Sequence, residues 1–208
     1  MNLRLVPRWP RAAPILLGLV VVLGGYTVFS PAPAAVVRPS LGYPPEVNGA
    51  RAQHSPPKPV LPVGAIGRLT IAAIAVDAVA RPVGLNSSGA MDTTPNIWDV
   101  GVFDQSVMPG EPGGALIEGH LDWTTGPAVF WDLHKLGNGV EIDYTSAAGT
   151  TSRFAVSKVR NVPYNSHIPE DVSTRTGTPM ITLITCSGAW ISSAHSYSTR
   201  LLLTATQI

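Results

Sequence analysis

Cysteine is nearly absent from this chain of 208 residues, since Cys186 is the only one. A single cysteine excludes an intrachain disulfide framework, a cysteine-based zinc cluster and an iron–sulfur site. Charged residues are also scarce, at 13 % of the chain, and the formal net charge is only +1. A protein that binds nucleic acid usually carries a basic excess on one face, so this class of partner is disfavoured.

Three further signatures are missing: an internal repeat, a P-loop, and a GxGxxG segment after an expected strand. Nucleotide binding through those motifs is therefore not indicated. What the chain does contain is 45 % hydrophobic residues, which excludes global disorder. Glycine and proline number 20 each, so the chain is interrupted by many turns.

The N-terminal segment contains an uncharged run of 18 residues, 12–29, directly after three arginines. As a helix this run would be roughly 27 Å long, close to the hydrocarbon thickness of a bilayer. The arginines predict that the rest of the chain lies outside the cell. Its length favours a retained single-pass anchor. The alternative is a signal peptide cleaved near Ala32-Pro33-Ala34. Residues 1–30 are thus predicted to be a membrane anchor or signal segment.

A proline-rich tract follows, with nine prolines in residues 31–64. Such a sequence forms neither a helix nor an interior strand, so we expect a semi-rigid extracellular linker. Residues 65–208 then form the folded domain. They carry 8 basic and 12 acidic residues, a net charge of −4, which again disfavours a nucleic-acid partner.

The folded domain has the pattern of a mainly β protein. Short apolar, β-branched runs are separated by clusters of Gly, Pro, Asn and Ser, which predicts an all-β barrel or sandwich. The predicted strands are Arg68–Ile74, Gly114–Glu118, Val140–Tyr144, Phe154–Val159, Met180–Thr185 and Arg200–Thr206. One short helical stretch is predicted, at Ala128–Leu136.

Cys186 stands at the end of one predicted strand, before Ser187-Gly188, and so at the rim of the sheet. Loops at such rims often carry catalytic residues. A buried structural thiol and a disulfide-linked dimer are the alternatives. Export of the domain favours a functional role for the thiol, because an unpaired cysteine is a liability in an oxidising compartment. A free thiol has a pKa of about 8.5, so a catalytic one needs a group that takes its proton.

The histidines of the domain are the candidates for that group. His120 is the best placed, because it follows an apolar run and precedes a loop. His195, nine residues after Cys186, is the second candidate, whereas His134 and His167 fit surface positions. Arg200 begins the last predicted strand. It is suited to stabilise an oxyanion beside the thiol, or alternatively to protect a sheet edge as an exposed charge.

The segments TLITC, which ends in Thr185-Cys186, and EGHLD, which contains His120, together with Arg200, resemble the sortases over residues 67–205. The segments IAAIAVDAVARPVGLNSSGAMD, MPGEPGGALIEGHLD and PAVFWDLHKLGNGVEIDY are most similar to the actinobacterial class F group. The resemblance implies an eight-stranded closed barrel. It also implies that Cys186, His120 and Arg200 are catalytic and that Thr185 assists substrate binding and the oxyanion site. Asp122 matches the acid of the family's GHxD segment, to which no role is assigned.

The resemblance further implies a cysteine transpeptidase at the bacterial cell membrane, with its catalytic domain extracellular. Its expected substrates are surface proteins with an LPXTG-like C-terminal sorting signal, cleaved between Thr and Gly through an acyl-enzyme thioester. The expected acceptor is an amine, such as a peptidoglycan precursor or a pilin lysine. This chemistry requires no metal and no cofactor.

Two alternatives remain at this stage. One is a catalytically inactive, membrane-tethered β-barrel that binds peptide or wall polymer. The other is a different cell-wall cysteine peptidase. Papain-like enzymes usually place the cysteine before the histidine, at the start of a helix, and L,D-transpeptidases usually carry an arginine soon after the cysteine. Here His120 precedes Cys186, and SGAW follows the cysteine.

Overall fold

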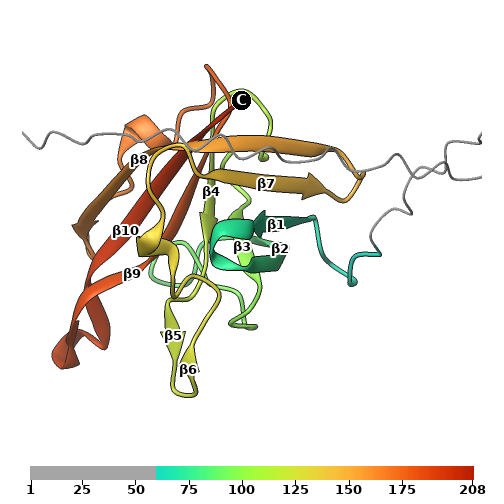
Figure 1. The fold of residues 1–208 in the computed structure, drawn as a ribbon. Coiled ribbons are helices and arrows are strands. Elements are labelled where there is room, and N and C mark those ends of the chain that lie inside the picture. Colours follow the sequence, from blue (N-terminus) through green and yellow to red (C-terminus); the bar gives the residue numbers. More distant parts are fainter. Residues whose placement is uncertain (1–59) are drawn as a thin grey trace, which may run out of the picture. The chain divides into compact units, whose positions relative to one another are not determined.

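The computed structural model describes residues 60–208, whose strands form a closed eight-stranded barrel (Figure 1). The strand order is β1-β2-β3-β4-β9-β10-β8-β7, and β7 pairs with β1 to close the barrel. This confirms the predicted mainly β fold. The barrel strands are β1 (Gly67–Ile71), β2 (Val76–Val83), β3 (Val100–Phe103), β4 (Gly114–Glu118), β7 (Glu141–Ser146), β8 (Thr151–Pro163), β9 (Met180–Ile191) and β10 (Ser196–Gln207).

Smaller elements decorate this barrel. Strands β5 (Asp122–Trp123) and β6 (Gly126–Pro127) form a separate hairpin. The helical elements of the described residues are four single 3₁₀ turns: η1 (Ala72–Ile74), η2 (Leu133–Lys135), η3 (Glu170–Val172) and η4 (Ser192–Ala194). The β5–β6 hairpin and the end of the β9–β10 hairpin project from the same end of the barrel (Figure 1).

Alternation of side chains along β9 and β10 separates an interior core from an outer face. Leu183 and Leu203, which pair across the two strands, point into the main core. Ile184 and Leu202 point outward and, with Leu116 and Val172, form a smaller apolar cluster on the outside of the barrel. This outer cluster lies next to Cys186 and supplies an apolar surface beside the thiol.

Two pairings place the predicted site residues. Strands β4 and β9 run parallel, with Glu118 opposite Ile184, so the end of β4 that precedes His120 lies beside the segment that carries Cys186. Strands β9 and β10 run antiparallel, with Arg200 opposite Cys186. The barrel thus brings together three residues that are distant in sequence.

Several predicted boundaries were wrong. Strands β2 and β3 were not predicted, and the run Arg68–Ile74 is divided, because β1 ends at Ile71 and η1 follows. The predicted helix Ala128–Leu136 contains only the single turn η2. Ala128 and Phe130, which lie in the predicted helix before η2, instead donate their backbone N–H groups to carbonyl oxygens of the loop after β4.

Strand β9 does not end at Cys186, as the sequence predicts, but continues to Ile191. The register with β10 shifts between the pairs Ser187–Thr199 and Trp190–Tyr197, which is a β-bulge with one extra residue on β9. Gly188 lies in this bulge with φ +82°, where a Cβ would come within 2.3 Å of the Ser198 hydroxyl oxygen. The Ser-Gly pair therefore bends the strand rather than ending it.

The predicted anchor, residues 1–30, and nearly all of the linker, residues 31–64, lie outside the described residues. Within residues 60–208, no helix has the length and apolar character needed to cross a bilayer.

Candidate active site

Arg200 is held beside Cys186 by its own strand. Its Nη1 donates to the carbonyls of Thr199 and Tyr197, at 3.1 and 3.3 Å, and its Nη2 donates to the Ser196 hydroxyl at 2.9 Å. The guanidinium also lies 6.0 Å from the centre of the Tyr164 ring. These contacts fix a permanent positive charge next to the thiol, a position suited to stabilising an oxyanion.

The surroundings of Cys186 keep its thiol largely protonated. Burial raises the pKa of Cys186, the positive charge of Arg200 opposes this rise, and the carboxylates of Asp122 and Glu118 add to it. The thiolate is therefore scarce at neutral pH. A proton acceptor must assist if this cysteine is to act as a nucleophile.

His120, which directly follows Gly119 at the end of β4, has a defined orientation. Its Nε2 lies 3.1 Å from the Thr94 carbonyl oxygen, and its ring meets the edge of Trp123 at a centroid distance of 5.5 Å and an angle of 72°. A carbonyl oxygen only accepts hydrogen bonds, so Nε2 carries a hydrogen in this arrangement. In the neutral ring, Nδ1 is then the nitrogen that exchanges a proton.

The residues that precede His120 and Cys186, which are Gly119 and Thr185, are each fixed by a close contact. A Cβ at Gly119 would lie 2.5 Å from the buried Phe130 ring, so only glycine fits before the histidine. The buried hydroxyl of Thr185 donates to the Gly119 carbonyl at 2.7 Å, and the Gly119 N–H donates to Ile184. These bonds join the strand of the cysteine to the segment of the histidine.

Glu118 is a residue that the sequence analysis did not select. It is only 5 % exposed, and its Oε1 accepts the N–H of Thr94 at 3.0 Å. Because the Thr94 carbonyl accepts from His120, one peptide segment connects the carboxyl of Glu118 to the imidazole. Burial raises the pKa of Glu118 to about 7, and the Thr94 N–H partly opposes that rise. The sequence feature that could have indicated Glu118 is the presence of an acid at the end of the otherwise apolar run GALIE.

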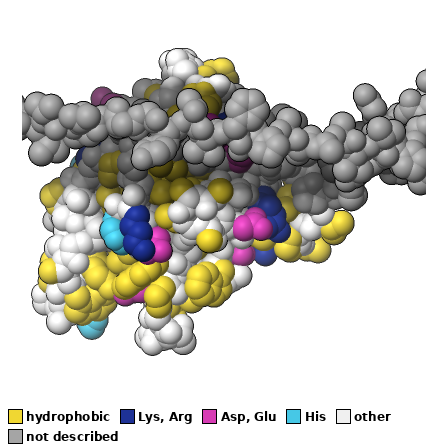
Figure 2. All heavy atoms as spheres, in the orientation of Figure 1, with side chains coloured by type: hydrophobic (Ala, Val, Ile, Leu, Met, Phe, Trp, Pro, Cys, Tyr) yellow, Lys and Arg dark blue, Asp and Glu magenta, His cyan; other side chains and the backbone are white. Residues whose placement is uncertain are grey.

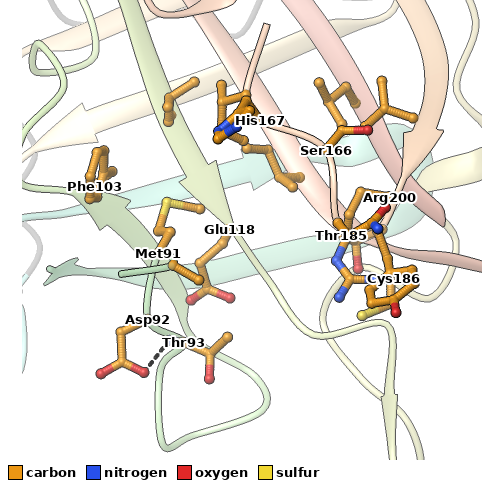
Figure 3. Close-up of a pocket in the computed structure, with 18 of the residues that line it drawn as sticks. Met91, Asp92, Thr93, Phe103, Glu118, Ser166, His167, Thr185, Cys186 and Arg200 are labelled. Carbon is orange, nitrogen blue, oxygen red and sulfur yellow. Dashed lines mark hydrogen bonds between the residues drawn. The ribbon is translucent and has the colours of Figure 1, made fainter. Parts of the chain in front are cut away.

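The site residues surround a cavity of about 580 Å³ on the outer face of the barrel. His120, Thr185, Cys186 and Arg200 all line it, and residues 88–93 and 162–168 form its sides. In Figure 3, Thr185, Cys186 and Arg200 gather at one end, while Met91 and Phe103 lie at the other. The cavity thus brings a thiol, an imidazole and a guanidinium together with an apolar surface.

The remaining histidines occupy different places. His167 lines the same cavity from its exposed rim. His134 lines a second cavity of about 350 Å³, which shares Thr185 and Cys186 with the first. His195 follows η4 at the tip of the β9–β10 hairpin, with φ 46°, and lines neither cavity. Within residues 60–208, no three His, Cys, Asp or Glu side chains are grouped as ligands for a metal ion.

Comparison with known families identifies the fold. Residues 69–208 match the family model of the sortase domain, which is more than half of the chain. The chain therefore belongs to the sortase family. A search of curated protein sequences finds no match.

Solved structures of sortases are similar in fold. Sortase C-1 from Actinomyces oris is 22 % identical with a TM-score of 0.57, and the match covers 70 % of this chain and 74 % of that one. Sortase C1 of Streptococcus agalactiae, in complex with MTSET, is 22 % identical with a TM-score of 0.57 and 71 % coverage of both chains. Sortase A from Corynebacterium diphtheriae is 23 % identical with a TM-score of 0.54, covering 69 % of this chain and 60 % of that one.

Proposed function

We propose that this protein is a cysteine transpeptidase that cleaves an LPXTG-like sorting signal between Thr and Gly and transfers the released protein to an amine. The observation that carries the proposal is the cavity in which Cys186, His120 and Arg200 meet. Cys186 is the nucleophile, His120 the general acid and base, and Arg200 the oxyanion ligand. Thr185 contributes to the substrate site through its position between Gly119 and Cys186.

In the first half-reaction, the Cys186 thiolate attacks the threonyl carbonyl carbon, and Arg200 stabilises the negative charge on the carbonyl oxygen. Protonated His120 gives its proton to the glycine nitrogen as the C–N bond breaks. The products are a thioester on Cys186 and a free glycine amine. The reacting form is the thiolate–imidazolium pair, which is a minority species because burial favours the protonated thiol.

In the second half-reaction, an ammonium on the acceptor loses one proton to His120 and one to solvent. Its nitrogen forms a C–N bond with the thioester carbonyl carbon, and the C–S bond breaks. Cys186 leaves as a thiolate, and the thiolate–imidazolium pair is restored. Water in place of the amine gives hydrolysis of the sorting signal.

The remaining parts of the proposal come from the sequence. Residues 1–30 anchor the chain in the bacterial membrane or direct its export, residues 31–64 act as a spacer, and residues 65–208 form the extracellular catalytic domain. Segments such as MPGEPGGALIEGHLD support assignment to the actinobacterial class F group. The acceptor is a peptidoglycan precursor or a pilin lysine.

The test is a peptide assay with the full chain in detergent micelles. A fluorogenic LPXTG library is incubated with and without an amine acceptor, beside the Cys186→Ala variant as control. We expect cleavage between Thr and Gly that requires Cys186, with an amide product when the amine is present. A chain that cleaves no member of the library would contradict the proposed activity. In that case, a thiol that also resists a methanethiosulfonate reagent would favour a binding barrel.

A further inference from the structure

The second cavity lies against the same thiol as the first. Its volume is about 350 Å³, and Thr185 and Cys186 line both cavities. Cys186 therefore stands where the two meet. An acyl group held in the first cavity would leave the second as a separate approach to the thioester.

Asp122 gives this second cavity a negative charge. The residue begins β5, two positions after His120, and its Oδ2 accepts the Tyr197 hydroxyl at 2.5 Å. Among the described residues, Tyr197 is the only side chain that donates to this carboxylate, and no lysine or arginine lines the cavity. Asp122 is only partly buried, so its carboxylate is accessible to a cationic ligand that enters this cavity.

The position of Asp122 works against the first half-reaction. Its charge raises the pKa of Cys186 and so reduces the amount of thiolate. It also raises the pKa of Tyr197 to about 12, which keeps that hydroxyl a hydrogen-bond donor. Because this carboxylate does not assist the nucleophilic thiol, its presence requires another explanation. The simplest explanation is that it binds a positively charged ligand.

Phe130, Trp131 and Tyr197 line the same cavity as this carboxylate. Trp131 lines the cavity and is 44 % exposed, whereas Trp190, 54 % exposed, contacts the Tyr197 ring edge-on at 5.4 Å. Trp123, 56 % exposed, contacts His120. Figure 2 shows hydrophobic side chains gathered on this face, over the β9–β10 and β5–β6 hairpins. A cavity that combines a carboxylate with aromatic rings is suited to a cation with an apolar stem, such as a lysine side chain.

We infer that the second cavity is the acceptor site and binds the primary ammonium of an alkylamine, with Asp122 as the anionic contact and Trp131 and Tyr197 against the alkyl stem. The inference rests on the proposed transpeptidase function and names the side of the thiol from which the second substrate enters. The bound ammonium lies next to the thioester and close to His120, which takes the proton that must leave before attack. Asp122 is a binding residue, and His120 remains the base.

The first experiment measures amine binding without catalysis. Full-length Cys186→Ala chain in detergent micelles is titrated with Nα-acetyl-lysine amide at constant ionic strength, and binding is followed by saturation-transfer NMR of the ligand. We expect saturable binding that Asp122→Asn weakens about tenfold, since one charge-assisted contact is lost. Asn at this position keeps an oxygen for the Tyr197 hydroxyl. Trp131→Ala, a change at an exposed ring, should weaken binding as well.

The controls separate the two cavities. Asp92→Asn removes the same charge from the first cavity and should leave amine binding unchanged, and the Nε-acetylated probe, which has no charge, should bind poorly. Absence of saturable binding, equal binding by Asp122→Asn, or loss of binding in Asp92→Asn would each overturn the inference. A wall stem peptide or a lysine-bearing protein segment that binds better than the free probe supports the site and identifies the source of the amine.

The second experiment uses the active chain and measures how the thioester is divided between amine and water. We expect Asp122→Asn to lower the ratio of amide to hydrolysed product about tenfold. A proportional fall of both products would place Asp122 in acylation and overturn the acceptor role. Amine binding in a chain that cleaves no peptide would instead contradict the proposed activity while the ammonium site stands.

Discussion

The buried carboxyl of Glu118 is expected to lower the free energy of unfolding as the pH rises. Burial raises the pKa of this carboxyl from 4.5 to about 7 in the folded chain. Below pH 4.5 the group is protonated in both the folded and the unfolded state and has no effect. Between pH 4.5 and 7 the unfolded chain ionises first, so the folded state loses stability over this range. Above pH 7 the loss is complete.

The size of this effect follows from the shift. A pKa that moves from 4.5 to about 7 corresponds to about 3 kcal/mol of unfolding free energy. Glu118→Gln keeps an oxygen that accepts the Thr94 N–H but cannot ionise. Relative to wild type, the variant should gain about 3 kcal/mol between pH 4.5 and 7, and this gain should persist above pH 7.

Urea denaturation of residues 60–208, followed by circular dichroism at a series of pH values, measures the difference. Glu141→Gln is the matched control, because Glu141 is an exposed glutamate on β7. It should not reproduce the gain between pH 4.5 and 7. A flat difference between Glu118→Gln and wild type across this range would show that the carboxyl is not desolvated, and the argument from its burial would fail.

Five other variants, at four positions, test the packing and the charges at the site. Gly119→Ala should lower the unfolding free energy by about 1–3 kcal/mol in urea denaturation, because its Cβ would overlap the Phe130 ring; an unchanged midpoint contradicts this. Thr185→Val should cost about 1–3 kcal/mol by the same measurement, and Thr185→Ser, which keeps the hydroxyl donor, should restore most of it. Arg200→Gln should raise the thiol pKa and slow methanethiosulfonate labelling at neutral pH, whereas Asp122→Asn should speed it; equal rates would exclude these two charges as influences on the thiol.

Much of the site was predictable because it depends on strands with clear patterns. The runs that became β4, β9 and β10 are apolar and β-branched, and each carries or precedes one site residue: His120, Cys186 or Arg200. The preference for His120 over His195 agrees with the geometry, since of these two histidines only His120 lines a cavity together with the cysteine. Sequence spacing favoured it modestly. The reason in the structure is that β4 runs parallel to β9, while His195 lies at a hairpin tip.

Other features needed contacts that no local pattern contains. Strand β2 includes Asp77 and Pro82, which weaken a strand signal, and it is stabilised by its pairing with β1 and β3. The role of Glu118 depends on Thr94, which lies 24 residues away and reaches β4 only in the folded chain. The continuation of β9 beyond Cys186 depends on a bulge opposite Ser198. The sequence predicts that the strand ends before Gly188, but this glycine is needed for the bend.

The two charges at the thiol have opposite effects on its pKa, and the two proposed half-reactions would account for both charges. Arg200 lowers the pKa of Cys186 and lines the first cavity, where the proposed mechanism develops negative charge on a carbonyl oxygen. Asp122 raises that pKa and lines the second cavity, where an ammonium is expected to enter. A site built only for acylation would gain from a lower thiol pKa and would have no use for Asp122. The Asp122 carboxylate, which shares its cavity with Trp131 and accepts the Tyr197 hydroxyl, therefore fits best as a contact for the second substrate of the proposed reaction.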